Sequence, residues 1–153
     1  MDGKMSSLSE EENQIIYSYL ENNDVFLIIA TKFQLEMIQK FGHEKICVDS
    51  THGTTEYDLL TTLVVVDEYG NGFPCCLCFT KKKDTITWIT FFTKVKERTG
   101  NINTKVFMSD DDPAFYNNAW CNVMGNAEHK LLCSWHVDHY LRQTTLKQNW
   151  LKN

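Results

Sequence analysis

The feature that most constrains the fold is a hairpin in the middle of the chain. Residues 58–66 form an apolar run rich in β-branched side chains, and residues 73–80 form a second run of strand length. Residues 68–72 between them read Glu-Tyr-Gly-Asn-Gly, a turn composition that tolerates positive φ. Strands joined by so short a turn pair antiparallel. A doubly wound parallel sheet, which needs a helix after its first strand, is therefore excluded.

The segments on either side of the hairpin predict a mixed α/β sheet. Asp84 and Asp112 have the positions of N-caps of two helices, and Pro113 fits the first turn of the second helix. The order from residue 45 is strand, strand, strand, helix, strand, helix, strand, helix, which is the element order of the ribonuclease H-like fold. The predicted strands span residues 46–48, 58–66, 73–80, 104–108 and 129–135, and the predicted helices span residues 85–98, 113–124 and 137 onward.

The first part of the chain is predicted to be a leader that contains helices and one strand. Ser9 and Glu12 have the spacing of a capping box, and the apolar residues after them recur at helical spacing as far as residue 20. Residues 24–30 have the composition of a strand, and Thr31 is placed as the N-cap of a second helix that ends at Gly42. Such an amphipathic leader needs a partner surface. The predicted domains are the leader, residues 1–44, and the core, residues 45–153.

Composition limits the classes of function. The formal net charge is −5, so no global positive field draws the chain to nucleic acid, although Lys81 to Lys83 form a local basic strip. Six cysteines without a paired spacing favour reduced thiols in an intracellular protein. No apolar run is long enough to span a bilayer, and the polar start of the chain does not have the pattern of a signal peptide. No membrane partner is expected.

Two aspartates occur in the same setting, each at the end of a predicted strand. Asp49 ends the first strand, where Ser50 is expected to open a turn, and Asp110 ends the fourth. Carboxylates from neighbouring strand ends suit Mg²⁺ or Mn²⁺, and a two-metal site of this kind supports phosphodiester displacement. Asp112 already has a structural task as an N-cap. The alternative for Asp49 is that its side chain only caps the turn after it.

Other candidate side chains leave two interpretations open. Cys133 and His136 are three residues apart, which is the spacing of half a zinc site, but no second half is evident. A buried cysteine with a structural or DNA-facing histidine explains the pair equally well. His52 either orients Asp49 or contacts DNA, or it is a turn histidine bonded to backbone.

Four blocks of the sequence, in this order, resemble the Mutator-like element (MULE) transposase domain. Residues 30–34, ahead of these blocks, are similar to the stretch that precedes the first aspartate in this family. The resemblance extends over nearly the whole chain. The blocks start at Asp49 (Asp-Ser-Thr-His-Gly-Thr), at Leu60 (Leu-Thr-Thr-Leu-Val-Val-Val-Asp-Glu-Tyr-Gly-Asn-Gly-Phe-Pro), at Met108 (Met-Ser-Asp-Asp-Asp-Pro-Ala-Phe-Tyr-Asn-Asn-Ala-Trp) and at Cys133 (Cys-Ser-Trp-His-Val-Asp).

The resemblance implies a ribonuclease H-like core with an Asp-Asp-Glu (DDE) triad. It also implies Mg²⁺-dependent cut-and-paste DNA transposition, binding to the terminal inverted repeats of a transposon, and a nuclear location. Carried onto this chain, the first two acids of the triad are Asp49 and Asp110. The cysteine–histidine motif of the family corresponds to Cys133 and His136.

One departure from the family pattern changes the expected activity. The family's glutamate lies beyond the cysteine–histidine motif, whereas here no glutamate follows Cys133 and Asp138 is the only acid after it. The sequence is therefore expected to be a transposase fragment with little or no activity, because two carboxylates hold metal ions more weakly than three. The alternatives are a domesticated or relic binding module that self-associates, and a small nuclease of the same fold that uses Asp138 as third ligand.

Overall fold

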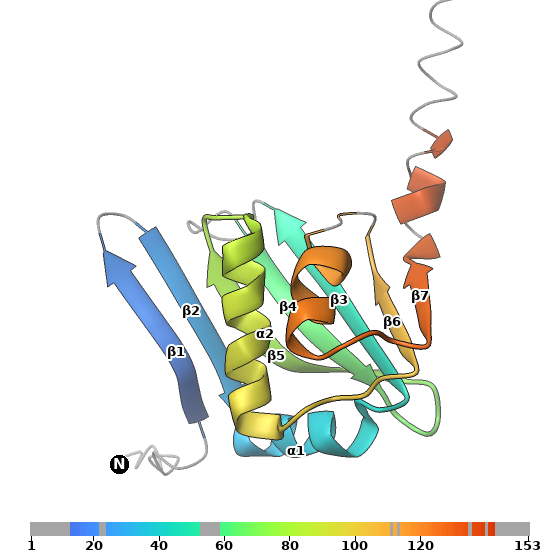
Figure 1. Cartoon of the computed structure of the whole chain (residues 1–153), viewed down its shortest axis with the longest axis horizontal. Coiled ribbons are helices and arrows are strands. Elements are labelled where there is room, and N and C mark those ends of the chain that lie inside the picture. The colour runs from blue at the N-terminus through green and yellow to red at the C-terminus, as the bar shows by residue number, and fades with distance from the viewer. Residues whose placement is uncertain are drawn as a thin grey trace, which may run out of the picture.

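The computed structural model describes residues 13–21, 24–52, 59–110, 112, 114–134, 136–139 and 141–142. Its centre is a seven-stranded mixed sheet with the strand order β1-β2-β5-β4-β3-β6-β7 (Figure 1). β6 pairs in parallel with β3 and with β7, and the other neighbours pair antiparallel. The strands are β1 (Asn13–Glu21), β2 (Asp24–Thr31), β3 (Lys45–His52), β4 (Leu59–Val66), β5 (Gly72–Thr80), β6 (Val106–Ser109) and β7 (His129–Leu132).

The predicted hairpin is confirmed as β4 and β5. Asp67 holds the turn between them, because one of its carboxylate oxygens accepts hydrogen bonds from the backbone N–H groups of Tyr69 (2.9 Å) and Asn71 (2.7 Å). Gly70 has a φ of 86°, a conformation that side chains with a Cβ rarely adopt. The hairpin can therefore be predicted from the sequence, because the contacts that form its turn are made between neighbouring residues.

Two of the predicted helices are confirmed, with their caps. The Asp84 carboxylate accepts from the backbone N–H of Thr87 (2.8 Å) at the start of α2, and Thr31 and Gln34 form a capping box at the start of α1. Gly42 follows α1, as the sequence indicated, but with an ordinary helical φ of −61° and not in a left-handed conformation. A Cβ there would approach Ile102 to 3.1 Å, which favours glycine by space. The helical elements are α1 (Lys32–Phe41), α2 (Thr85–Thr99), the π-helical turn η1 (Tyr116–Trp120) and α3 (Cys121–Val123).

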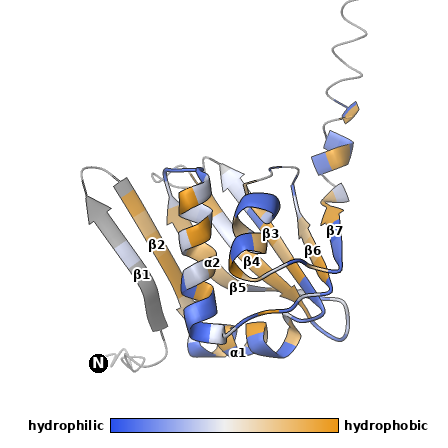
Figure 2. Cartoon of the chain, viewed as in Figure 1, coloured by the Kyte–Doolittle hydropathy of each residue, from blue (hydrophilic) through white to orange (hydrophobic). Residues whose placement is uncertain are grey.

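The helices α2, η1 and α3 lie on one face of the sheet, and the core is between the two layers (Figure 1). On β4, alternate residues from Leu59 to Val65 are buried, as expected for a sheet covered on one face. Apolar residues dominate the central strands and the inward side of α2 (Figure 2). Aromatic rings fill the layer next to β6: Phe107 lies 4.9 Å from Trp120 and 5.1 Å from Tyr116, measured between ring centroids.

The single helix predicted from residue 113 is wrong in detail. The chain instead makes the π-helical turn η1, in which the N–H of Trp120 bonds to the carbonyl of Phe115 (2.8 Å), and then the three-residue α3. The Asp112 carboxylate does cap this region by accepting from the N–H of Ala114 (2.9 Å). The wider turn buries Phe115, Tyr116 and Trp120 together. No proline or glycine marks such a turn, so the helical pattern could not reveal it.

The helix predicted for the first apolar segment is also wrong, because this segment is β1. It pairs antiparallel with β2 from Asn13 opposite Thr31 to Glu21 opposite Asp24. An irregularity between Ile15 and Tyr17 shifts the register, which hides the alternation expected of a strand. The capping-box residues before Asn13 lie outside the described residues. Pairing with β2 therefore decides the conformation of β1, in spite of the weak helical periodicity of its sequence.

The segment 24–44 is built into the sheet and the core. The predicted strand is confirmed as β2, and it pairs with β5. Ile28 of β2 and Ile38 of α1 are fully buried in the core. The partner surface that the leader was expected to need is therefore β5 and the core itself, while a domain boundary at residue 45 stays a prediction.

The turn predicted after Asp49 is replaced by more strand. β3 continues to His52, because Ser50 and Thr51 pair with Thr61 and Leu60 of β4. The hydroxyl oxygens of Ser50 and the buried Thr61 lie 2.6 Å apart and share a hydrogen bond. Asp49 therefore lies inside a strand, and the alternative of a simple turn cap does not hold.

The last elements follow the predicted order but are shorter. β6 and β7 have four residues each, and helical residues 134, 136–139 and 141–142 follow β7. Lys81 to Lys83 are exposed after β5, as a solvated strand end would be. Over the parts of the chain described above, no helix is long and apolar enough to cross a membrane.

Candidate active site

Asp49, within β3, and Asp110, directly after β6, lie on neighbouring strands and on the same face of the sheet. In the parallel ladder of β3 and β6, Cys47 is opposite Met108, and in that of β6 and β7 Met108 is opposite Leu131. Two residues further along each chain come Asp49, Asp110 and Cys133. Since side chains alternate between the faces of a sheet, all of these side chains share one face. Buried Ile46 and Phe107 point to the other face, toward the helices.

His136 completes this group, although it comes from beyond the last strand. Its Nε2 lies 3.7 Å from Oδ1 of Asp49, and the two side chains are 31% and 59% exposed, respectively. The sequence left open whether His52 orients Asp49, contacts DNA or is a turn histidine bonded to backbone. The side chain of His52 lies outside the described residues, so its role is still a prediction. The register between β6 and β7, continued two residues past Leu131, places Cys133 next to Asp110; this pairing is the signal that would have brought the Cys133 segment to the site.

The environment of Asp110 disfavours its charge. Burial raises its pKa, and the nearby carboxylates of Asp112 and Asp49 act in the same direction. A hydrogen bond from the backbone N–H of Asp112 (3.2 Å) and the imidazole of His136 oppose this rise. A cation bound here would compensate the crowded carboxylates, so the donor set fits a hard divalent ion.

Metal ligation itself is not preformed. Among the described residues, no three histidine, cysteine, aspartate or glutamate side chains are already arranged to hold an ion. Burial raises the pKa of the Cys47 thiol, and the half-buried Cys133 lies near enough to add to this rise. The zinc interpretation of Cys133 and His136 is still a prediction. Asp138, the alternative third acid, instead forms an ion pair with Arg142 at 2.7 Å.

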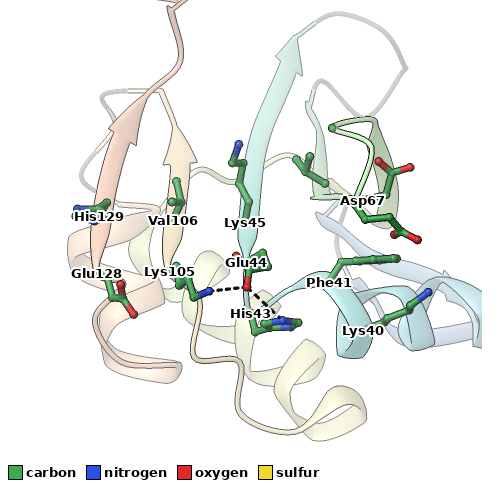
Figure 3. Close-up of a pocket in the computed structure, with 13 residues that line it drawn as sticks. Lys40, Phe41, His43, Glu44, Lys45, Asp67, Lys105, Val106, Glu128 and His129 are labelled. Atoms are coloured by element: carbon green, nitrogen blue, oxygen red, sulfur yellow. Dashed lines mark hydrogen bonds and ion pairs between the residues drawn. The ribbon is translucent and has the colours of Figure 1, made fainter.

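A separate pocket opens at the opposite end of β3, where this strand begins (Figure 3). Its volume is about 680 Å³, and charges of both signs line it. Glu44 bonds to Nζ of Lys105 at 2.6 Å and approaches Nε2 of His43 at 3.5 Å. These pairs satisfy one another, and the pocket contains none of the residues that the sequence indicated. Size alone does not make it the functional site.

These observations define the class: a mixed α/β protein with paired carboxylates on adjacent strands of its sheet. The MULE transposase domain model matches residues 45–140, and the chain belongs to this family. The match starts with the first residue of β3 and includes Asp49, Asp110, Cys133 and His136. The resemblance found in the four sequence blocks is therefore confirmed. A comparison with curated proteins finds no match.

Proposed function

We propose that this domain is part of the catalytic core of a DNA transposase that cleaves and joins strands in a metal-dependent reaction. The observation that carries the proposal is that Asp49, within β3, and Asp110, directly after β6, lie on neighbouring strands of a MULE-family domain. The element order supports a ribonuclease H-like fold for the segment from β3 onward. The DNA partner would be the terminal inverted repeats of a transposon, and the location the nucleus.

In this proposal Asp49 and Asp110 hold one or two Mg²⁺ or Mn²⁺ ions. Bound there, the metal supplies charge stabilisation for the attacking and leaving oxygens of a phosphodiester. Asp110 is the more buried of the two, and it follows β6 directly, so the sheet restricts its movement. Asp49 is largely exposed, which leaves its carboxylate open to a DNA backbone approaching from solvent.

We further propose that these 153 residues catalyse little transposition by themselves. A DDE centre uses three acids, and no glutamate follows Cys133 in this sequence. Asp138 is already engaged by Arg142, which weakens the case for a small nuclease that depends on Asp138. The net charge of −5 is consistent with DNA affinity that depends on other parts of a transposase.

The test is titration calorimetry with Mg²⁺ and Mn²⁺ on the wild-type chain, Asp49→Ala and Asp110→Ala. We expect the wild type to bind and both variants to lose binding together, because the two carboxylates share one centre. Glu36→Ala is the matched control, since Glu36 is an exposed acid on α1. A folded wild-type chain that binds neither ion would refute the proposal.

A non-catalytic binding module is the second candidate, and one observation favours it. Four large aliphatic side chains are exposed on β7 and the helical residues after it, and β7 is an edge strand of the described sheet. An exposed apolar edge favours pairing with a second copy of the chain. Sedimentation at increasing concentration should show a dimer that Leu132→Lys weakens; a monomer throughout would exclude this candidate. The four side chains are Leu131, Leu132, Val137 and Leu141.

A further inference from the structure

The spacing between Asp49 and His136 fits a shared metal ion better than a direct hydrogen bond. Their Oδ1 and Nε2 atoms are 3.7 Å apart, beyond the usual 2.7–3.2 Å of such a bond. Ligand atoms that each lie ~2.1 Å from one ion can be at most ~4.2 Å apart. The observed distance is inside that limit, so both atoms can reach one ion without a shift of the backbone.

The backbone holds His136 at this place. The N–H of Cys133 donates to the carbonyl of Ser109 at 2.8 Å, which attaches the end of β7 to the end of β6. The N–H of Val137 then donates to the carbonyl of Cys133 at 3.2 Å, which starts the helical residues. His136 lies within this first turn, so the cysteine–histidine spacing sets where its imidazole is presented.

Asp110 belongs to the same electrostatic group. β3 and β6 pair in parallel with Cys47 opposite Met108, so Asp49 and Asp110, each two residues further on, are neighbours across the sheet. The three side chains do not yet have ligand geometry, but Asp49 is largely exposed and its carboxylate can rotate. A rotamer change of exposed Asp49 is a small rearrangement compared with a movement of strands.

We propose that His136 is a third metal-binding side chain, beside Asp49 and Asp110, and that it makes the centre prefer Mn²⁺ to Mg²⁺. The inference rests on the proposed function and names the ion selectivity of that site. Mg²⁺ favours oxygen ligands and near-ideal octahedral geometry, whereas imidazole suits transition metals. A site with two carboxylates and one imidazole is therefore a poorer site for Mg²⁺ than for Mn²⁺.

A purely orienting histidine makes a different prediction. If His136 only positioned Asp49, its loss would lower the affinity for every ion that Asp49 binds, by a similar factor. If His136 is a ligand, its loss removes the selectivity itself. The ratio of the Mn²⁺ and Mg²⁺ affinities therefore separates the two roles.

The experiment measures Mn²⁺ and Mg²⁺ affinities by calorimetry for the wild type and His136→Ala, with His43→Ala as the control. His43 is an exposed histidine near the other end of β3. We expect His136→Ala to lose at least the ~10–100-fold in Mn²⁺ affinity that outer-shell partners of metal ligands are worth, and far less in Mg²⁺ affinity. His43→Ala should match the wild type with both ions.

Cobalt provides a second readout that does not depend on activity. Co²⁺ bound to the wild type should show visible absorption that changes in His136→Ala, because a nitrogen ligand is lost. His136→Gln repeats both measurements if the alanine variant does not fold. Equal losses for Mn²⁺ and Mg²⁺, or no loss, would overturn the inference alone. A wild type that binds no ion would overturn the proposed function as well.

Discussion

The backbone N–H of Cys133 lies 2.8 Å from the carbonyl oxygen of Ser109. This hydrogen bond extends the ladder of β6 and β7 beyond the last residue of β7. It aligns Cys133 with Asp110, the residue after Ser109, and it brings His136 close to Asp49. One main-chain hydrogen bond thus joins the sequence block that contains Asp110 to the block that contains Cys133 and His136.

Cys133→Pro should disturb the metal centre through the backbone. Proline removes the N–H that bonds to Ser109, while Leu132 is in a strand, a conformation that a following proline permits. We expect Mn²⁺ affinity to fall by about fivefold, since a lost backbone hydrogen bond is worth about 1 kcal/mol and this bond holds the segment that carries His136. Calorimetry measures this change. Cys133→Ala keeps the N–H and should retain Mn²⁺ binding; equal losses in both variants would show that the thiol matters instead.

Asp110→Asn should stabilise the metal-free chain at neutral pH. Because burial raises the pKa of Asp110 above its ordinary value of 3.8, the folded state holds this proton more tightly than the unfolded state. The contribution of Asp110 to the free energy of unfolding therefore falls as the pH rises from 3.8 through the raised folded pKa. Urea unfolding across pH 3 to 8 should show a gain for the variant that disappears in acid. A gain that is constant with pH would contradict this account, and Glu36→Gln is the control.

Asp84→Ala should lower the free energy of unfolding by about 1 kcal/mol, the usual effect of losing an N-cap. The side chain accepts from the N–H of Thr87, and this hydrogen bond lowers the pKa of Asp84. A lowered folded pKa means that the charge contributes stability above the unfolded pKa and loses it as the pH falls through the folded pKa. Urea titration at neutral pH measures the change. Asp84→Asn keeps an acceptor and should retain most of the stability; if it matches alanine, the hydrogen bond is not the cause.

Phe107→Ala should lower the free energy of unfolding by about 3–5 kcal/mol, the range for removing a buried aromatic side chain. The ring is fully buried and contacts Trp120 at 4.9 Å between centroids. Denaturant unfolding followed by tryptophan fluorescence measures the loss. Phe107→Leu removes less volume and should cost less. A loss below about 1 kcal/mol for alanine would mean that the cavity collapses without penalty.

The parts of the fold that could be predicted depend on contacts close in sequence. The turn from Asp67 to Asn71 and the caps at Thr31 and Asp84 are made within a few residues, so the local pattern reveals them. Asp49 and Asp110 were found because each follows an apolar strand core. Their use of metal is still a prediction.

The parts that could not be predicted depend on distant partners. β2, the partner of β1, is the next strand along the chain, but β2 is itself held in the sheet by β5, about 50 residues further on, where Ile28 pairs with Cys78. The π-helical turn η1 packs Tyr116 and Trp120 against Phe107. No residue type within this turn predicts a π-helical conformation. A weak local preference yields to such packing.

By itself, the sequence indicated the hairpin and the element order of the core, because turn propensity, caps and alternation are properties of neighbouring residues. It also indicated Asp49 and Asp110 as the candidate acids. Only the tertiary structure decided that the carboxylate of Asp49 faces His136. Asp49 and His136 are 87 residues apart in the sequence. In the sheet, β6 lies between β3, which contains Asp49, and β7, which His136 follows. The pairing of parallel strands, which no local pattern encodes, sets the distance between them.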